Sequence, residues 1–227
     1  MLLVIPNVLD AERLQEVQGL LRHADFIEGK LSAGKEAQAV KQNQELSPHS
    51  PQRRRLDAIV MSALVQDPRY QAAVLPLRVA TAFYVRYQVG MGYGFHIDDP
   101  VMGPMSGRYR SDVSTTIFLN SPEAYAGGEL VIQTALGEQR IKAEAGSAVL
   151  YPASTWHQVT PVTEGERLVA VTWAQSLVKS AEQRELLYQL AQAREGLLAK
   201  ASHAAYRVEL AQLSTAYSNL VRMWSEV

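Results

Sequence analysis

Cysteine is absent from the 227-residue chain, and the net charge is only −1. The missing thiols exclude disulfides, thiolate zinc sites and cysteine nucleophiles, and they are compatible with a reducing compartment. The balanced charge gives no reason to expect nucleic acid or an acidic membrane as a partner. No apolar run approaches the roughly 18 residues that a membrane span needs. The start "MLLVIPNVLDAERL" lacks a basic region and a cleavage site, so we expect a soluble, cytoplasmic protein.

The composition is that of a globular protein, with 47% apolar and 20% charged residues. The length suits one domain, or one domain with a small appendage. Apolar spacing predicts a helix from Asp10 to about Asp25, with Asp10 as its N-cap. Residues 28–55 are polar and predict a loop, in which the basic run 53–55 is a solvated helix start rather than an anion site. Residues 56–74 predict a second helix.

The middle of the chain changes character and favours strands. Short segments rich in β-branched and aromatic residues alternate with Gly, Pro or Asn. They are "ATAFYVRYQV", "STTIFL", "ELVIQT", "QRIKA", "SAVLY" and "RLVAVTW". Such closely spaced strands predict a sandwich or a jelly-roll barrel.

After about residue 176 the pattern is helical again. Ser180 and Gln183 fit a capping box, and two apolar stripes follow, within 186–198 and 210–224. We expect a helical hairpin that packs on the barrel or on another subunit.

The stretch "YQVGMGYGFHIDDP" places His96 and Asp98 just past three glycines, in a chain with only five histidines. If the backbone is extended there, the two side chains point the same way and can reach one cation. The pair alone is weak support for a metal site, because His-x-Asp occurs by chance. His157 lies at a predicted strand end and is the candidate third ligand. The remaining histidines are expected to be surface or structural residues: His23, His49 and His203.

Two histidines and one carboxylate would occupy one face of an octahedral ion and leave three positions open. Open positions on nitrogen and oxygen ligands favour non-haem Fe(II) working with O2. A closed zinc site would need a fourth protein ligand, usually sulfur, which this chain lacks.

Arg167 stands ten residues past His157, at the start of the strand "RLVAVTW". The intervening "TPVTEGE" resembles a hairpin, and a centre near Thr163 or Glu164 would make His157 and Arg167 face each other across a ladder. An arginine inside a small barrel needs an anion, and its planar fork suits a carboxylate. A salt bridge to a protein acid such as Glu164 or Glu166 is equally compatible with this spacing.

In these residues the chain resembles the Fe(II)/2-oxoglutarate-dependent dioxygenases, and specifically the bacterial PKHD-type hydroxylases, relatives of the prolyl 4-hydroxylase catalytic domain. Further matching stretches are "RSDVSTTIFLNSPEAYAGGELVI", "AEAGSAVLYPASTWHQVTPVTEGERLVAVTW" and "LRHADFIEGKLSAGKEAQAVKQNQEL". The resemblance implies an α+β fold, a double-stranded β-helix (jelly roll, cupin-like) with N-terminal helices and a C-terminal helical extension. The expected division is a dioxygenase domain at 1–177, with its catalytic core at about 78–177, and an extension at 178–227.

The resemblance also implies residue roles. His96, Asp98 and His157 would hold Fe(II), and Arg167 would bind the distal carboxylate of 2-oxoglutarate. Prolyl hydroxylases place a lysine where Arg167 stands, so the arginine narrows the match to the PKHD-type group and weakens any expectation of a proline substrate. The AlkB-type nucleic-acid demethylases carry a further arginine a few residues on, where this chain continues "LVAVTW".

Other positions take a meaning from the same resemblance. Tyr84 and Tyr87 lie on opposite faces of one predicted strand, so one of them could donate a hydroxyl to the cosubstrate, with core packing as the alternative. Thr116 and Trp173 could line the site or pack in the core. Gly127 and Gly128 are expected to permit a tight turn and a close backbone approach.

The implied function is hydroxylation of an unidentified small-molecule or amino-acid-like substrate, with O2 consumed and 2-oxoglutarate decarboxylated to succinate and CO2. Ascorbate stays open as an additional cofactor, and iron uptake or siderophore metabolism as the context. The expected partners are the substrate and further copies in a homo-oligomer, without nucleic acid or membrane. The alternatives are a non-catalytic cupin-like protein that binds metal or senses iron and 2-oxoglutarate, and a metal-free interaction module built on the helical tail.

Overall fold

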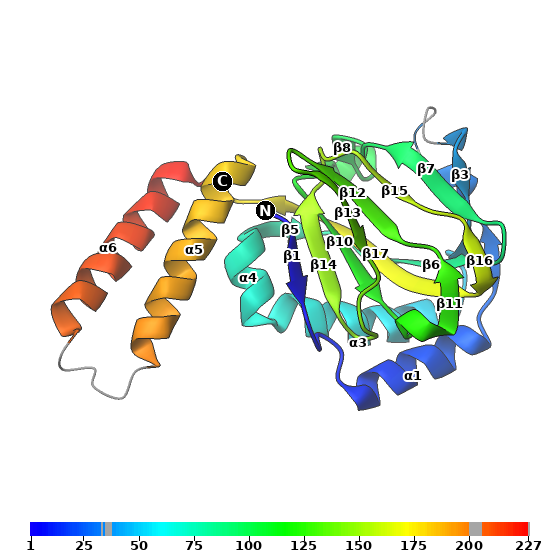
Figure 1. Ribbon diagram of the computed structural model, residues 1–227. Helices are drawn as coiled ribbons and strands as arrows, with labels where there is room; N and C mark the ends of the chain where they lie inside the picture. Colours follow the sequence, from blue (N-terminus) through cyan, green and yellow to red (C-terminus); the bar gives the residue numbers. More distant parts are fainter. Residues whose placement is uncertain (33, 35–37, 200–205, 227) are drawn as a thin grey trace.

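The computed structural model describes residues 1–32, 34, 38–199 and 206–226. Figure 1 shows a β-rich body with helices beneath it and a pair of helices to one side. The helices are α1 (Ala11–Arg22), α3 (Arg53–Gln66), α4 (Pro68–Val74), α5 (Ala181–Leu198) and α6 (Arg207–Trp224), with 3-10 turns at Gly29–Ser32, Met105–Gly107 and Pro122–Ala124. The expectation for His203 lies outside the described residues.

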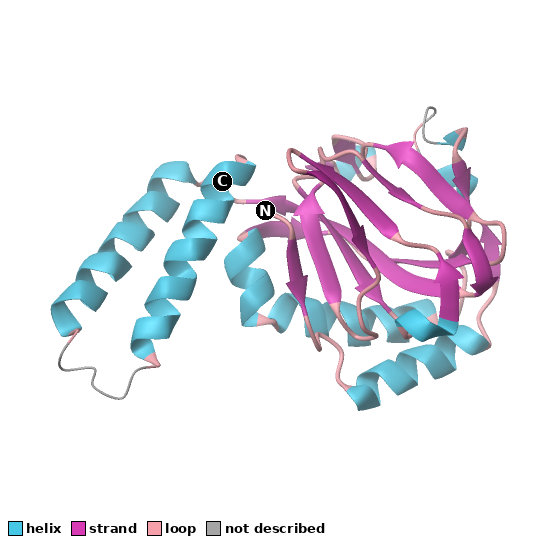
Figure 2. Cartoon of the chain, viewed as in Figure 1, coloured by secondary structure: helices cyan, strands magenta, loops and turns pink. Residues whose placement is uncertain are grey.

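Two antiparallel sheets face each other and form the body (Figure 2). The larger sheet has the order β1 (Leu3–Ile5), β14 (Ala148–Pro152), β10 (Val113–Phe118), β17 (Arg167–Ser176), β6 (Phe83–Tyr87), β4 (Gln44–Leu46) and β2 (Phe26–Glu28), and β5 (Pro76–Val79) also pairs with β17. The smaller sheet has the order β13 (Gly137–Ile141), β12 (Leu130–Thr134), β15 (His157–Val159), β7 (Gly92–His96) and β3 (Lys41–Gln42). Two short ladders join β11 (Tyr125–Gly127) to β16 (Val162–Gly165) and β8 (Val101–Met102) to β9 (Tyr109–Arg110). The predicted α+β jelly-roll fold is therefore confirmed.

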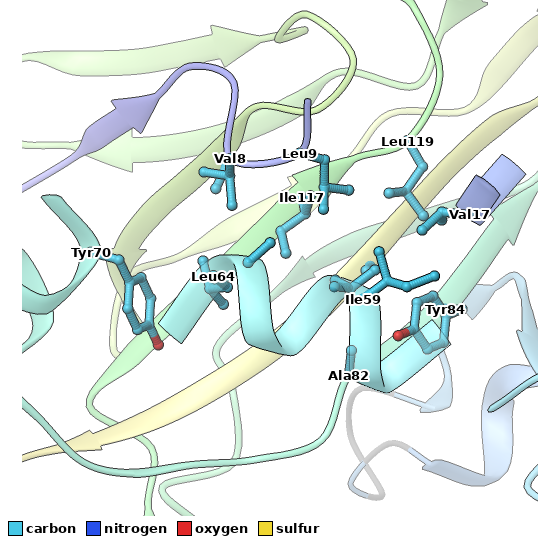
Figure 3. Close-up of a cluster of buried hydrophobic side chains, with 14 of the residues drawn as sticks. Val8, Leu9, Val17, Ile59, Leu64, Tyr70, Ala82, Tyr84, Ile117 and Leu119 are labelled. Carbon is cyan, nitrogen blue, oxygen red and sulfur yellow. The ribbon is translucent and has the colours of Figure 1, made fainter. Parts of the chain in front are cut away.

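Strand β10 is buried on both faces, because helices cover one face of its sheet and the smaller sheet covers the other. Its side chains alternate, so that Ile117 belongs to a cluster on the helix side and Phe118 to a cluster in the interior. On the helix side, Ile59 and Leu64 of α3 join the cluster of Ile117 (Figure 3). Burial of one such side chain stabilises the fold by about 1.5–3 kcal/mol.

The interior between the sheets is apolar at one end and polar at the other. Phe118 packs there with Leu130, Val149 and Val169. Further back along the same face of β10, Ser114 and Thr116 are buried although they are polar. Polar side chains at this depth indicate that the space in front of them is a site rather than packed core.

The helix predicted over 56–74 is wrong in its extent. Two helices occupy the region: α3 begins at Arg53, and α4 begins at Pro68. Asp67 between them is extended, and its carboxylate caps α4 by accepting from the Arg69 amide at 2.8 Å. Proline lacks the amide donor that a continuous helix would need at this point, so the chain starts a new helix instead.

The strands predicted between residues 80 and 173 are confirmed, with ends shifted by up to three residues. The polar loop predicted at 28–55 is wrong in part, since β3 and β4 lie within it. Of the three glycines before His96, Gly92 and Gly94 lie inside β7. A Cβ at Gly92 would come within 3.0 Å of the Val159 carbonyl, and one at Gly94 within 2.9 Å of Val40. These glycines permit close strand contacts rather than a turn.

The predicted C-terminal helical hairpin is confirmed as α5 and α6, which stand beside the barrel (Figure 1). Ser180 caps α5 by accepting from the Gln183 amide at 3.1 Å. Arg184 is buried in α5 and donates to the carbonyls of Val178 and Lys179 at 2.8 Å each, which anchors the helix to the end of the barrel. None of the helices in the described part of the chain combines the length and hydrophobicity that a membrane crossing requires.

Candidate metal centre

Three metal-ligating side chains meet in the interior of the barrel. His96 ends β7, Asp98 follows two residues later, and His157 begins β15, the strand that pairs with β7. One ligand atom from each lies within 4.8 Å of the others, and the two imidazole centroids are 4.2 Å apart. All three side chains are buried, with Asp98 only 6% exposed.

Both imidazoles are oriented by backbone carbonyls. Nδ1 of His96 lies 2.8 Å from the Gly94 oxygen, and Nδ1 of His157 lies 2.8 Å from the Thr155 oxygen. A carbonyl only accepts, so each Nδ1 carries the hydrogen and each Nε2 keeps a free lone pair. Burial, with a contribution from His157, lowers the pKa of His96 to about 3. A neutral imidazole with its Nε2 free is the form that binds a metal ion.

The Asp98 carboxylate completes the set. Its Oδ1 lies 3.8 Å from Nε2 of His157, and its Oδ2 is buried without a regular hydrogen bond from any described residue. Burial raises its pKa, whereas His157, Trp173 and Ser114 lower it. A buried carboxylate oxygen without a donor is costly in a metal-free protein, and a cation would remove that cost.

The donor set limits which metal fits. Two nitrogens and one carboxylate oxygen are present, and in the described part of the chain no fourth such ligand joins the group. This set leaves coordination positions open and matches the two-histidine, one-carboxylate arrangement of non-haem Fe(II) sites. A closed structural zinc site does not fit.

The triad opens into a cavity of about 660 Å³ between the two sheets. This volume lies within the range of about 300–1,000 Å³ that is usual for small-molecule sites. Along β17, Trp173, Val171 and Arg167 line the same cavity, so the triad and Arg167 share one cavity.

Arg167 is the most deeply buried charge in this cavity, at 1% exposure. It makes no ion pair with a carboxylate in the described residues, and its Nε has no hydrogen-bond partner among them. Its Cζ lies 5.0 Å from the ring of Tyr87 and 5.4 Å from that of Phe118. The alternative of a salt bridge to Glu164 or Glu166 is not realised, since Glu164 is exposed and the Glu166 carboxylate lies 3.7 Å from Arg86 instead. A buried guanidinium in this setting calls for an anionic ligand.

The hairpin predicted between His157 and Arg167 is wrong. His157 pairs with β12 and β7 in the smaller sheet, whereas Arg167 pairs with Tyr87 in the larger sheet. The connecting segment forms β16, which pairs with β11 instead. His157 and Arg167 therefore reach the cavity from two different sheets.

Gly127 and Gly128 permit the tight turn and the close backbone approach that the sequence predicts. Both have positive φ, 66° and 62°. A Cβ on Gly127 would lie 2.2 Å from the Pro161 oxygen, and one on Gly128 would lie 3.1 Å from Cδ of Arg167. The turn thus holds the chain directly against the Arg167 side chain.

The two candidate tyrosines divide as their alternation predicts. Tyr87 lines the cavity. Tyr84 does not line it; it lies in the helix-side core, and its hydroxyl donates to Asp57 at 3.0 Å. Tyr84 is thereby removed from the candidate cosubstrate ligands. Thr116 and Trp173 both line the cavity.

Sequence reasoning missed a polar wall of the cavity on β3 and β4. Lys41 and Glu45 form a buried ion pair at 2.6 Å, and Asn43 between them is 4% exposed. The segment "KQNQEL" has no apolar alternation, so it carried no strand signal. Tyr125 was missed as well: it is buried, and Arg167 opposes the rise that burial causes in its pKa. Its position two residues before Gly127 was the sequence feature that could have indicated it.

A family model described as the 2OG-Fe(II) oxygenase superfamily matches residues 82–175. The chain is 47% identical over 227 residues to a PKHD-type hydroxylase of Thioalkalivibrio sulfidiphilus, and 43% identical over 226 residues to one of Synechococcus elongatus. Each of these alignments covers 100% of both chains. A solved prolyl-4-hydroxylase of Pseudomonas putida is similar with a TM-score of 0.53 at 18% identity, over 77% of this chain and 92% of that one. That structural similarity supports the fold.

Proposed function

The chain belongs to the PKHD-type hydroxylases of the 2OG-Fe(II) oxygenase superfamily, and from this membership we propose that it hydroxylates a small molecule or an amino-acid-like group. It is an oxidoreductase that works with Fe(II), 2-oxoglutarate and O2. In the proposed reaction, one atom of O2 enters the substrate as a hydroxyl. The other enters succinate as 2-oxoglutarate loses CO2.

The proposed iron ligands are Nε2 of His96, Nε2 of His157 and a carboxylate oxygen of Asp98. Three observations support them: the free Nε2 lone pairs, the lowered pKa of His96 and the orphaned Asp98 Oδ2. When bound, iron supplies the activation of O2. The protein supplies the ligand geometry and the cavity between the two sheets.

Arg167 is the residue we propose for the distal carboxylate of 2-oxoglutarate, and its burial without a partner acid among the described residues is the observation that carries the proposal. An unpaired buried charge costs several kcal/mol, and a dicarboxylate that reaches it would offset that cost. Tyr87 and Thr116 line the same cavity and are proposed as further contacts.

The wider context is proposed on the family resemblance. The dioxygenase domain is assigned to 1–177 and the helical extension to 178–227, a boundary that falls between β17 and α5. We expect a cytoplasmic homo-oligomer that binds neither nucleic acid nor membrane. A siderophore-related substrate and a stimulation by ascorbate complete the proposal.

An anaerobic titration tests the proposed function. Apo-protein receives Fe(II) and then 2-oxoglutarate, and the visible charge-transfer band of the iron chelate is followed in wild type, in Arg167→Ala and in Arg140→Ala. Arg140 is a matched control on the exposed strand β13. Loss of charged hydrogen bonds worth about 1.5–3 kcal/mol predicts that Arg167→Ala needs roughly 10–100-fold more 2-oxoglutarate. Tight iron binding without a band in wild type would instead favour the sensing or storage alternative.

A further inference from the structure

We propose that Arg78 binds a carboxylate of the substrate at the mouth of the cavity, so that the enzyme acts on an anionic small molecule or side chain. The inference rests on the proposed function, because it assigns the open end of the same cavity. It concerns a residue that neither the metal triad nor the 2-oxoglutarate anchor uses.

Arg78 shares a strand face with Arg167 but stands at the other end of the cavity. Arg167 opens β17 opposite Tyr87, whereas Gln175, eight residues later, pairs with Arg78 of β5. Residues separated by an even number in a strand share a face, and so do directly opposed residues in a ladder. Eight residues of strand place the two arginine positions about 26 Å apart. Trp173, which contributes to the environment of Asp98, lies between them.

The Arg78 guanidinium is held over the mouth by the segment that carries β8 and β9. Its Cζ lies 5.4 Å from the ring centroid of Tyr109, within the range of a cation–π contact. A Cβ at Gly107 would lie 2.8 Å from Nη2 of Arg78, so the side chain passes close to this backbone. Tyr109 in turn points its hydroxyl at Sδ of Met102, 3.6 Å away. The guanidinium is therefore positioned before any ligand arrives.

Among the residues that the structure describes, no acid neutralises Arg78. Glu45, Asp98 and Asp99 also line the cavity, yet in the described residues no carboxylate makes an ion pair with Arg78. Arg110, which lies nearby on β9, contrasts with it, because it pairs with Asp112 at 2.6 Å and Glu226 at 3.1 Å. Among the described residues, neither of the two arginines that line the cavity, Arg78 and Arg167, has a partner acid.

Each end of the cavity carries an arginine. With 2-oxoglutarate on the buried Arg167, the triad lies beside Trp173, between the two arginine positions, and the exposed Arg78 marks the solvent side of the cavity. A substrate that places a carboxylate on Arg78 directs its other end towards the metal. The planar fork of arginine favours a carboxylate over a neutral amide at such a position.

The test uses the full chain loaded anaerobically with Fe(II) and saturating 2-oxoglutarate, which blocks Arg167. The probes are benzoate and N-acetylglycine, each paired with its neutral amide, benzamide and N-acetylglycinamide. Calorimetric titration gives each dissociation constant for wild type, Arg78→Gln, Arg78→Lys and Arg108→Gln. Arg108 is the matched control, since it is exposed nearby and does not line the cavity.

We expect at least one carboxylate to bind wild type and Arg108→Gln about ten-fold more tightly than its amide. The preference should vanish in Arg78→Gln and return in part in Arg78→Lys. Equal binding of acids and amides to wild type, absence of carboxylate binding, or a preference that survives in Arg78→Gln would each overturn the inference. The charge-transfer band is read in the same samples. An intact band without carboxylate preference defeats this inference alone, whereas a missing band in wild type defeats the proposed function.

Discussion

The side-chain amide of Asn43 and the hydroxyl of Tyr87 lie 3.3 Å apart, with Nδ2 of Asn43 as the donor. The amide therefore occupies a lone pair of the phenol oxygen, and the hydroxyl hydrogen of Tyr87 is left to point elsewhere. Burial raises the pKa of Tyr87, so the phenol stays protonated at neutral pH. Because Tyr87 lines the cavity beside Arg167, we infer that its hydroxyl is a second donor for the 2-oxoglutarate proposed at Arg167.

Replacing this phenol should weaken 2-oxoglutarate binding. One neutral hydrogen bond contributes about 0.5–1.5 kcal/mol, so Tyr87→Phe should raise the dissociation constant roughly 2–10-fold in the anaerobic titration. Tyr84→Phe is the matched control, since its hydroxyl contacts Asp57 outside the cavity. It should lower thermal stability and leave 2-oxoglutarate affinity unchanged. An equal loss of affinity in both variants would show that Tyr87 acts only through the fold.

Removal of a metal ligand should abolish both iron binding and turnover. Changes to residues that merely orient ligands lower metal affinity about 10–100-fold, so Asp98→Ala and His96→Ala should lose more than that. Iron content after desalting and oxygen uptake with 2-oxoglutarate measure the two effects. His49→Ala, an exposed histidine, should retain both. Full activity of the Asp98→Ala protein would refute the assigned centre.

The turn behind Arg167 should not tolerate a side chain. At Gly127, φ is 66° and a Cβ would lie 2.2 Å from the Pro161 oxygen, so Gly127→Ala combines strain with a clash and should cost at least about 2 kcal/mol of unfolding free energy. Gly196→Ala is the contrasting change, because that helical glycine has open space around it. It should stabilise by up to about 1 kcal/mol. Urea unfolding of both variants measures the difference, and equal stabilities would contradict the role given to the turn.

The free energy of unfolding should depend on pH through Asp67, at the junction between α3 and α4. Hydrogen bonds from Arg69 lower the pKa of Asp67 in the folded state, so its stabilising contribution is complete above its unfolded pKa of about 4. That contribution declines as the pH falls through the lowered folded value. Asp67→Asn should therefore cost about 1 kcal/mol at pH 7 and progressively less towards pH 3, in urea unfolding at each pH. A constant difference across this range would show that charge is not involved.

Local spacing predicted the parts of the site that lie close together in the chain. His96 and Asp98 sit side by side because an extended backbone repeats its direction every two residues. Tyr84 and Tyr87 divide between core and cavity for the same reason. The placement of His157 and Arg167 in two different sheets was not predictable in this way, since it depends on the pairing of β16 with β11.

Lys41, Asn43 and Glu45 escaped prediction because polarity at the sequence level cannot distinguish a solvated loop from the wall of a polar cavity. Their burial follows from tertiary pairing with β7 and β6. The helix break at Asp67 could have been predicted from the sequence, because Pro68 lacks the amide hydrogen that a continuous helix would need. Apolar periodicity on both sides obscured it.

Strand β17 fixes the distance between the side chains that it contributes to the cavity. Arg167 and Trp173 occupy one face of it six residues apart, a separation that pleating fixes at about 20 Å. The backbone of β17 is tied on both edges, to β10 and to β6 and β5, so this separation cannot adapt to the ligand. The cavity that Arg167 and Trp173 line therefore keeps its length along β17 whichever ligand enters.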